Sequence, residues 1–90
     1  MTLASRTVLI TNKRGLHARA SAKFVTIAAS LGVVANVEKD GSSVVGTSIM
    51  GLMMLGAAMG DTITITASGD GAAETVRTLA ELVEAKFGEE

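Results

Sequence analysis

The segment RGLHARASAK, residues 14–23, holds the side chains best suited to chemistry, including His17, the single histidine of the chain. We expect Gly15 to permit a bend and His17 to stand at a helix start, where unpaired N–H groups and the helix dipole favour an anion. An imidazole is a competent nucleophile toward phosphorus, and guanidinium and helix amide groups suit a phosphoryl dianion. One interpretation of the pattern is therefore a transferable phosphoryl group on His17, with Arg19 and Lys23 expected to face the same region.

A plainer interpretation of the same residues is an ordinary surface histidine among bases that keep the domain soluble. Short motifs are poorly specific, so the local pattern by itself favours this interpretation. No second histidine or carboxylate lies near His17 in the sequence to act as a base, and no glycine-rich nucleotide loop of the GxxxxGK type is present. The residues around His17 therefore do not assign it a function by themselves, and the rest of the chain is needed to decide between the two interpretations.

The composition predicts one folded domain over residues 1–90, because 48% of the residues are apolar and 19% are charged. With no cysteine and one histidine, disulfides and thiolate metal sites are excluded, so we expect no metal and no cofactor. The N-terminal residues lack the cationic start and sustained apolar segment of a secretory signal. We therefore expect a cytoplasmic location.

The charges are unevenly distributed along the chain. Residues 1–37 contain five bases and no acid, whereas residues 38–90 contain three bases and nine acids. A nucleic-acid binder usually carries a larger basic surplus and stacking aromatics, and the aromatic residues here are Phe24 and Phe87 alone. A small anionic group or an acidic partner is the better prediction, and nucleic acid is not expected.

Apolar periodicity predicts strands over residues 6–11, 33–38, 43–46 and 61–68, and helices over residues 18–31 and from Ala72 to Phe87. Gly32 is placed to end the first helix with a left-handed cap, and an Asp-Gly pair at 40–41 favours a hairpin turn. With one further helix after residue 48, the order is β-α-β-β-α-β-α. The expected fold is α+β, an open-faced sandwich of a four-stranded antiparallel sheet with three helices on one face.

The stretch GTSIMGLMMLGAAMG, residues 46–60, lies in a region without charge. Its glycines and serines argue against membrane insertion, so we expect a short helix with Leu52 and Leu55 turned inward. A helix face buries only a stripe, so Ile49, Met50 and Met53 are expected to be at least partly exposed as an adaptable apolar patch. Ser48 precedes this helix and is a good N-cap, where a phosphate would repel an apolar docking partner.

Two segments, NKRGLHARASAKF and GTSIMGLMMLGAAMGDTITITASG, carry a specific pattern, with 31 residues from His17 to Ser48. They resemble the HPr family, the histidine-containing phosphocarriers of the bacterial phosphoenolpyruvate-dependent sugar phosphotransferase system. One departure is Ala20, which follows Arg19 where the family usually has proline. Because alanine forms helices well and leaves its N–H available, a modestly looser helix start is expected rather than lost function.

The resemblance implies a relay rather than a stand-alone catalyst. His17 would accept a phosphoryl group on Nδ1 from enzyme I and pass it to the A component of an enzyme II or a regulatory counterpart. Arg19 would contact the phosphoryl oxygens, and Ser48 would be the site for an HPr kinase/phosphorylase. The implied docking residues are Ala22, Ile49, Met50 and Met53, and we expect a monomer.

Two alternatives stay open at this point. One is a regulatory binding module that signals through Ser48, and the retained His17 and Arg19 argue against it. The other is the nitrogen-related branch of the same family, with a different enzyme I and no sugar import. The segment TSIMGLMML favours the HPr type proper.

Overall fold

Strand β4 (Thr62–Ser68) lies inside the sheet and illustrates how the residue pattern builds it. Ile63, Ile65 and Ala67 are buried on one side of the strand, while the threonines between them face the other side. In this computed structural model, which describes residues 3–89, β4 pairs antiparallel with β1 (Leu3–Leu9) and with β2 (Ala35–Lys39). Strand β3 (Ser42–Val45) pairs antiparallel with β2, so the strand order is β1-β4-β2-β3.

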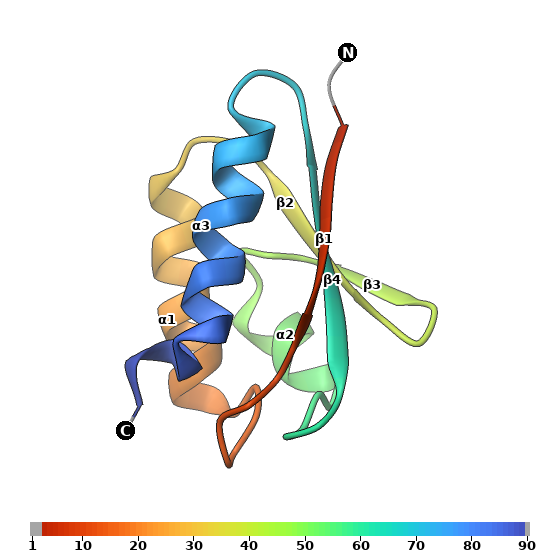
Figure 1. Ribbon diagram of the computed structural model, residues 1–90, viewed down its shortest axis with the longest axis vertical. Helices are drawn as coiled ribbons and strands as arrows, with labels where there is room; N and C mark the ends of the chain where they lie inside the picture. The colour runs from red at the N-terminus through yellow and green to blue at the C-terminus, as the bar shows by residue number, and fades with distance from the viewer. Residues whose placement is uncertain (1–2, 90) are drawn as a thin grey trace.

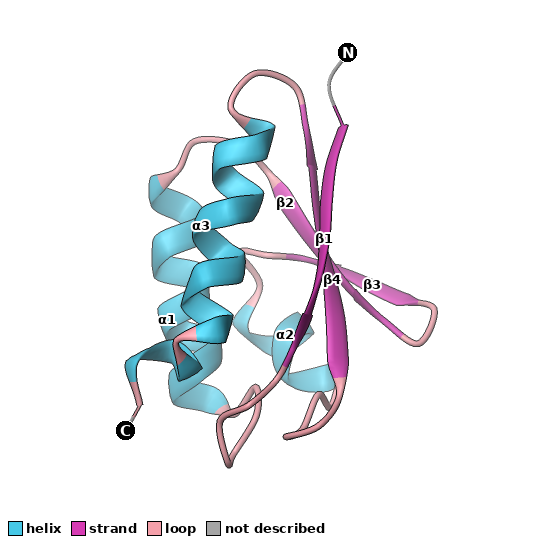
Figure 2. Ribbon diagram, viewed as in Figure 1, coloured by secondary structure: helices cyan, strands magenta, loops and turns pink. Residues whose placement is uncertain are grey.

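Helices α1 (Ala18–Ser30), α2 (Ile49–Met54) and α3 (Ala72–Glu84) lie on one side of the sheet (Figure 1). The other side of the sheet carries no helix among the described residues, which confirms the open-faced sandwich (Figure 2). The core lies between the layers and is centred on Phe24, Ile65 and Leu79, each fully buried. Within residues 3–89, no helix is both long enough and apolar enough to cross a membrane.

Several local predictions are confirmed. Gly32 has φ +73° just after α1, and Asp40 and Gly41 have φ +52° and +86° in the β2–β3 turn. Leu52 is fully buried in α2, and Leu55 is partly buried against the core. The short α2 is therefore anchored through its leucines, as its apolar spacing predicts.

The predicted bounds of the first two strands were wrong at their ends. β1 spans Leu3–Leu9 rather than residues 6–11, because it pairs in register with β4, whose last partner residue is Thr62. β2 begins at Ala35, since Ala35 is the first residue to find a partner in β4, and Val33 therefore lies outside the strand. Strand ends depend on pairing partners distant in sequence, which local composition does not contain.

The last helix also ends earlier than predicted. α3 stops at Glu84, and a short 3₁₀ turn, η1 (Lys86–Gly88), follows it. Lys86 and Phe87 both take left-handed backbone angles, with φ +59° and +57°, and Phe87 is only 2% exposed. The chain thus leaves the helical path, buries the Phe87 ring in the core and brings η1 against α1 (Figure 1).

Candidate active site

His17 is the N-cap residue of α1, with an extended backbone at φ −72° and ψ 179°. Its carbonyl accepts the first helical hydrogen bond, from Ser21 N–H at 2.9 Å. Among residues 3–89, no side chain caps this helix, and its first turn contains no acid. The N–H groups of the first turn, including that of Ala20, are therefore not taken up by the helix itself, and such free amides favour an anion.

The loop before His17 is held tightly by the segment that follows α2. Gly15 has φ +60°, and a Cβ atom added there would lie 2.3 Å from the Ala57 carbonyl oxygen. Leu16 N–H donates to that same oxygen at 3.0 Å, and the buried Ser21 hydroxyl donates to the Leu16 carbonyl at 3.1 Å. A side chain at residue 15 has no room, so the predicted bend at glycine is confirmed and has a packing reason.

His17 lines a cleft of about 460 Å³ together with basic side chains and the C-terminal turn. The bases of this cleft are Lys13, Arg14, Arg19 and Lys23. In the part of the chain that the structure describes, none of the four forms an ion pair. The cleft therefore gathers positive charge that favours an anion, and it includes Arg19 and Lys23, which were expected to face the region of His17.

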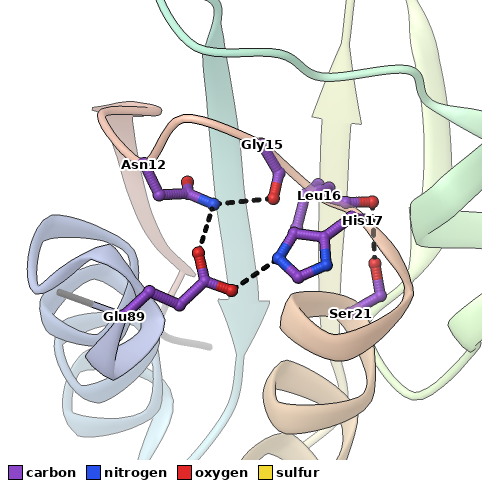
Figure 3. A network of polar contacts seen from close by, with 6 residues as sticks. All are labelled: Asn12, Gly15, Leu16, His17, Ser21 and Glu89. Atoms are coloured by element: carbon purple, nitrogen blue, oxygen red, sulfur yellow. Dashed lines mark hydrogen bonds and ion pairs between the residues drawn. The ribbon is translucent and has the colours of Figure 1, made fainter.

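A carboxylate lies against the histidine from the far end of the sequence. The Nε2 atom of His17 is 2.5 Å from Oε2 of Glu89, and the two side chains are 16% and 23% exposed (Figure 3). Asn12 is almost fully buried, and its Nδ2 donates to Oε1 of Glu89 at 3.2 Å and to the Gly15 carbonyl at 2.8 Å. Both oxygens of the Glu89 carboxylate are thus engaged, one by the histidine and one by the loop before it.

These contacts favour the ionised form of Glu89. Burial opposes ionisation, but the hydrogen bonds from His17 and Asn12 and the charges of His17 and Arg14 outweigh it, so the pKa of Glu89 lies below its ordinary value. No carboxylate lies near His17 in the sequence, but the fold brings the Glu89 carboxylate against it from 72 positions away. No sequence motif marks Glu89, one of nine acids, and Asn12 belongs to the segment NKRGLHARASAKF without a predicted role of its own.

Ser48 is the N-cap of α2, as predicted. Its Oγ accepts a hydrogen bond from Gly51 N–H at 2.9 Å, and its backbone is extended. The apolar side chains after it are exposed, at 40% for Ile49, 67% for Met50 and 40% for Met53. Met54 is 80% exposed and belongs to the same helix, although it was not among the predicted docking residues.

The predicted site residues fall into two groups. His17 and Arg19 share the basic cleft, which Ala20 also lines, whereas Ser48, Ile49, Met50 and Met53 do not line it. Ala22 is half-buried on α1, and α1 packs against α2. Figure 1 places α2 and the beginning of α1 at the same end of the molecule, so the apolar patch and the cleft lie on neighbouring elements.

Comparison with known proteins agrees with this geometry. Residues 4–85 match the family model for the PTS HPr component phosphorylation site. The phosphocarrier protein HPr of Neisseria meningitidis is 45% identical over 87 residues, which cover 97% of this chain and 98% of the relative. The phosphocarrier protein NPr of Shewanella violacea is 37% identical over 89 residues, with 99% and 98% covered.

Among solved structures, HPr of Thermoanaerobacter tengcongensis superposes with a TM-score of 0.91 at 44% identity, covering 97% of this chain and 98% of the other. The match thus extends over nearly the full length in both sequence and fold. The chain belongs to the HPr family of phosphocarrier proteins of the phosphotransferase system.

Proposed function

We propose that this chain accepts a phosphoryl group on His17 from phosphorylated enzyme I. It then passes the group to the A component of an enzyme II or to a regulatory counterpart. The observation that carries this proposal is the position of His17, at the uncapped start of α1 and in a cleft with four bases that form no ion pair within residues 3–89. A phosphoryl group there meets positive charge and amide N–H groups but stays near solvent.

The proposed transfer needs no cofactor. A lone pair of a His17 ring nitrogen forms the new N–P bond, and the bond from phosphorus to the donor atom of enzyme I breaks, returning its electron pair to that atom. Arg19 contacts the phosphoryl oxygens, and the N–H of Ala20 remains available to them because position 20 is not proline. The same step in reverse, with a different partner, discharges His17.

Docking is assigned to the apolar side chains beside the cleft. Ile49, Met50 and Met53 are exposed on α2, and methionine adapts to several partner surfaces. Ala22 on the neighbouring α1 completes this proposed surface. A carrier that must meet a donor and several acceptors in turn benefits from such a patch, since each partner has to dock over the same histidine.

Regulation is assigned to Ser48. A phosphate on this N-cap hydroxyl suits the positive end of α2 but adds about two negative charges next to Ile49 and Met50. Partner surfaces that are apolar or acidic would then bind less well. The proposed modifying enzyme is an HPr kinase/phosphorylase, which transfers the γ-phosphoryl group of ATP to the hydroxyl.

The proposal is tested by incubating the protein with its cognate enzyme I and labelled phosphoenolpyruvate. Wild type is expected to gain an acid-labile, base-stable phosphoryl group, and His17→Ala is expected to gain none. Arg19→Ala, which keeps the nucleophile, is expected to be labelled more slowly. If wild type stays unlabelled under conditions in which enzyme I labels itself, the carrier function is wrong.

The nitrogen-related branch is a second candidate, favoured by the NPr relative from Shewanella violacea. That branch would use a different enzyme I and would not serve sugar import. The two candidates are separated by measuring labelling rates with the sugar-branch and nitrogen-branch enzymes I of the same cell. We expect faster labelling by the sugar-branch enzyme, and the reverse order would assign the chain to the nitrogen branch.

A further inference from the structure

The contact between Glu89 and His17 bears on which ring nitrogen reacts. In Figure 3, Nε2 of His17 points at the Glu89 carboxylate, and the other ring nitrogen, Nδ1, lies on the opposite side of the ring. An ionised carboxylate can only accept hydrogen bonds. Nε2 must therefore carry a proton, and in the neutral ring Nδ1 is the nitrogen with a free lone pair.

We propose that Glu89 is a positioning residue that holds the proton of His17 on Nε2 and thereby presents Nδ1 as the nucleophile. The inference rests on the proposed phosphoryl transfer to His17 and adds to it the group that selects the reacting atom. A carboxylate plays the same orienting role toward histidine in other catalytic sites, where it fixes the tautomer and supports charge on the ring.

The backbone is built to deliver this carboxylate. Lys86 and Phe87 are consecutive non-glycine residues with left-handed φ angles, a conformation that persists only where the surroundings enforce it. Phe87 supplies that enforcement, because its ring is buried in the core. Hydrogen bonds from Gly88 N–H to the Ala85 carbonyl and from Glu89 N–H to the Lys86 carbonyl close the turn. The turn redirects the chain from the end of α3 toward the start of α1.

Asn12 fixes the carboxylate from the other side. Its Nδ2 bridges Oε1 of Glu89 and the Gly15 carbonyl, so the C-terminal turn is tied to the loop that carries His17. Because both oxygens of Glu89 have partners, the carboxylate cannot rotate without losing one of them. Hydrogen bonds to both His17 and Asn12 therefore fix the orientation of the Glu89 carboxylate, which a side chain on the open surface would not have.

The proposal also accounts for the charge that develops during transfer. When Nδ1 forms the bond to phosphorus, the proton stays on Nε2, and the ring gains positive character that the Glu89 carboxylate faces directly. On discharge, the N–P bond breaks with its electron pair returning to Nδ1, and the ring is again neutral with its proton on Nε2. No proton has to enter or leave the site in either direction.

Chemical phosphorylation tests this without any partner protein. Potassium phosphoramidate transfers its phosphoryl group to histidine and releases ammonia, and ³¹P NMR distinguishes the Nδ1 product from the Nε2 product. We expect wild type to form the Nδ1 product and Glu89→Ala to raise the share of Nε2 product by roughly tenfold, the scale expected when one charge-assisted hydrogen bond is lost. Glu89→Gln keeps an acceptor without the charge and is expected to lie between them.

The matched control is Glu81→Gln, which removes the same charge from an exposed position on α3. It is expected to behave as wild type, and ¹⁵N spectra of the imidazole are expected to show Nε2–H in wild type and a detectable Nδ1–H form in Glu89→Ala. A Glu89→Ala protein that is folded and keeps both the wild-type product ratio and the wild-type tautomer would overturn the proposal. Absence of labelling by enzyme I, with product selectivity intact, would instead overturn the carrier function alone.

Discussion

The Glu89 carboxylate lies 2.5 Å from Nε2 of His17, although the two are 72 positions apart in the chain. His17 comes from the loop after β1, and Glu89 follows the left-handed turn after α3. The first and last elements of the fold thus meet at the proposed phosphoryl site. Changes at the C-terminal turn are therefore expected to affect His17 itself.

The first prediction concerns how the stability of the fold depends on pH. Because the folded-state pKa of Glu89 lies below its ordinary value of 4.5, its contacts stabilise the fold above that pH, and this contribution is lost as pH falls through the lowered folded-state pKa. We expect wild type to unfold at higher temperature than Glu89→Gln at neutral pH, and the difference to vanish once the pH has fallen below the lowered folded-state pKa of Glu89. Thermal unfolding followed by circular dichroism measures this, with Glu81→Gln as control. A difference that is unchanged at low pH would show that the carboxylate charge plays no part.

A second prediction concerns the loop that carries the histidine. Gly15→Ala places a Cβ atom 2.3 Å from the Ala57 carbonyl oxygen at a left-handed residue, so we expect a loss of roughly 2–5 kcal/mol in the free energy of unfolding. Gly32→Ala is the matched control, because Gly32 is also left-handed but a Cβ atom added there has no contact within 4 Å among the described residues, and we expect a loss of about 1 kcal/mol. Urea unfolding gives both values, and equal losses would contradict the packing argument.

Much of the fold follows from local pattern. Alternation in β4, the apolar stripe of α1 and the Asp-Gly turn correctly predict strand, helix and hairpin, because in each case the apolar face and the turn residues agree. The left-handed turn at Lys86 and Phe87 does not follow, because the spacing of Val83 and Phe87 fits a continuing helix equally well. The chain turns there because the Phe87 side chain packs into the core, and the location of the core depends on the tertiary fold.

The same contrast holds for the candidate site. His17 and its bases are close together in sequence, so their spacing can suggest an anion site on a helix start. Asn12 and Glu89 complete the site only through tertiary folding. For Ser48, one property follows from local sequence and another does not. Its role as N-cap depends on Gly51, three positions further along, whereas its distance from the cleft depends on how α2 packs.

A third prediction separates the structural role of Ser48 from its proposed regulatory role. Ser48→Ala removes the acceptor for Gly51 N–H, and we expect a loss of about 1 kcal/mol in stability. Ser48→Asp keeps an N-cap acceptor, so we expect near wild-type stability but slower phosphoryl transfer from enzyme I. Ser43→Asp, which adds the same charge at an exposed position of β3, serves as control. A Ser48→Asp protein labelled as fast as wild type would refute the regulatory role.

A fourth prediction concerns the apolar patch. Met50 is 67% exposed, and Met50→Glu is expected to raise the KM for enzyme I by roughly tenfold while leaving the thermal midpoint close to wild type. Leu3→Glu is the control, because Leu3 is 74% exposed at the start of β1, and this end of β1 lies at the opposite end of the molecule from α2 in Figure 1. Equal effects of the two variants would argue against docking at α2.

The central claim is that His17 relays a phosphoryl group, and a label chase tests it most directly. The protein is charged with enzyme I and labelled phosphoenolpyruvate, separated from both, and then mixed with the A component of an enzyme II from the same cell. We predict one label per chain before mixing, none on His17→Ala, and movement of the label to the acceptor. A label that forms on any residue other than His17, or that no acceptor component or regulatory counterpart removes, would contradict the account.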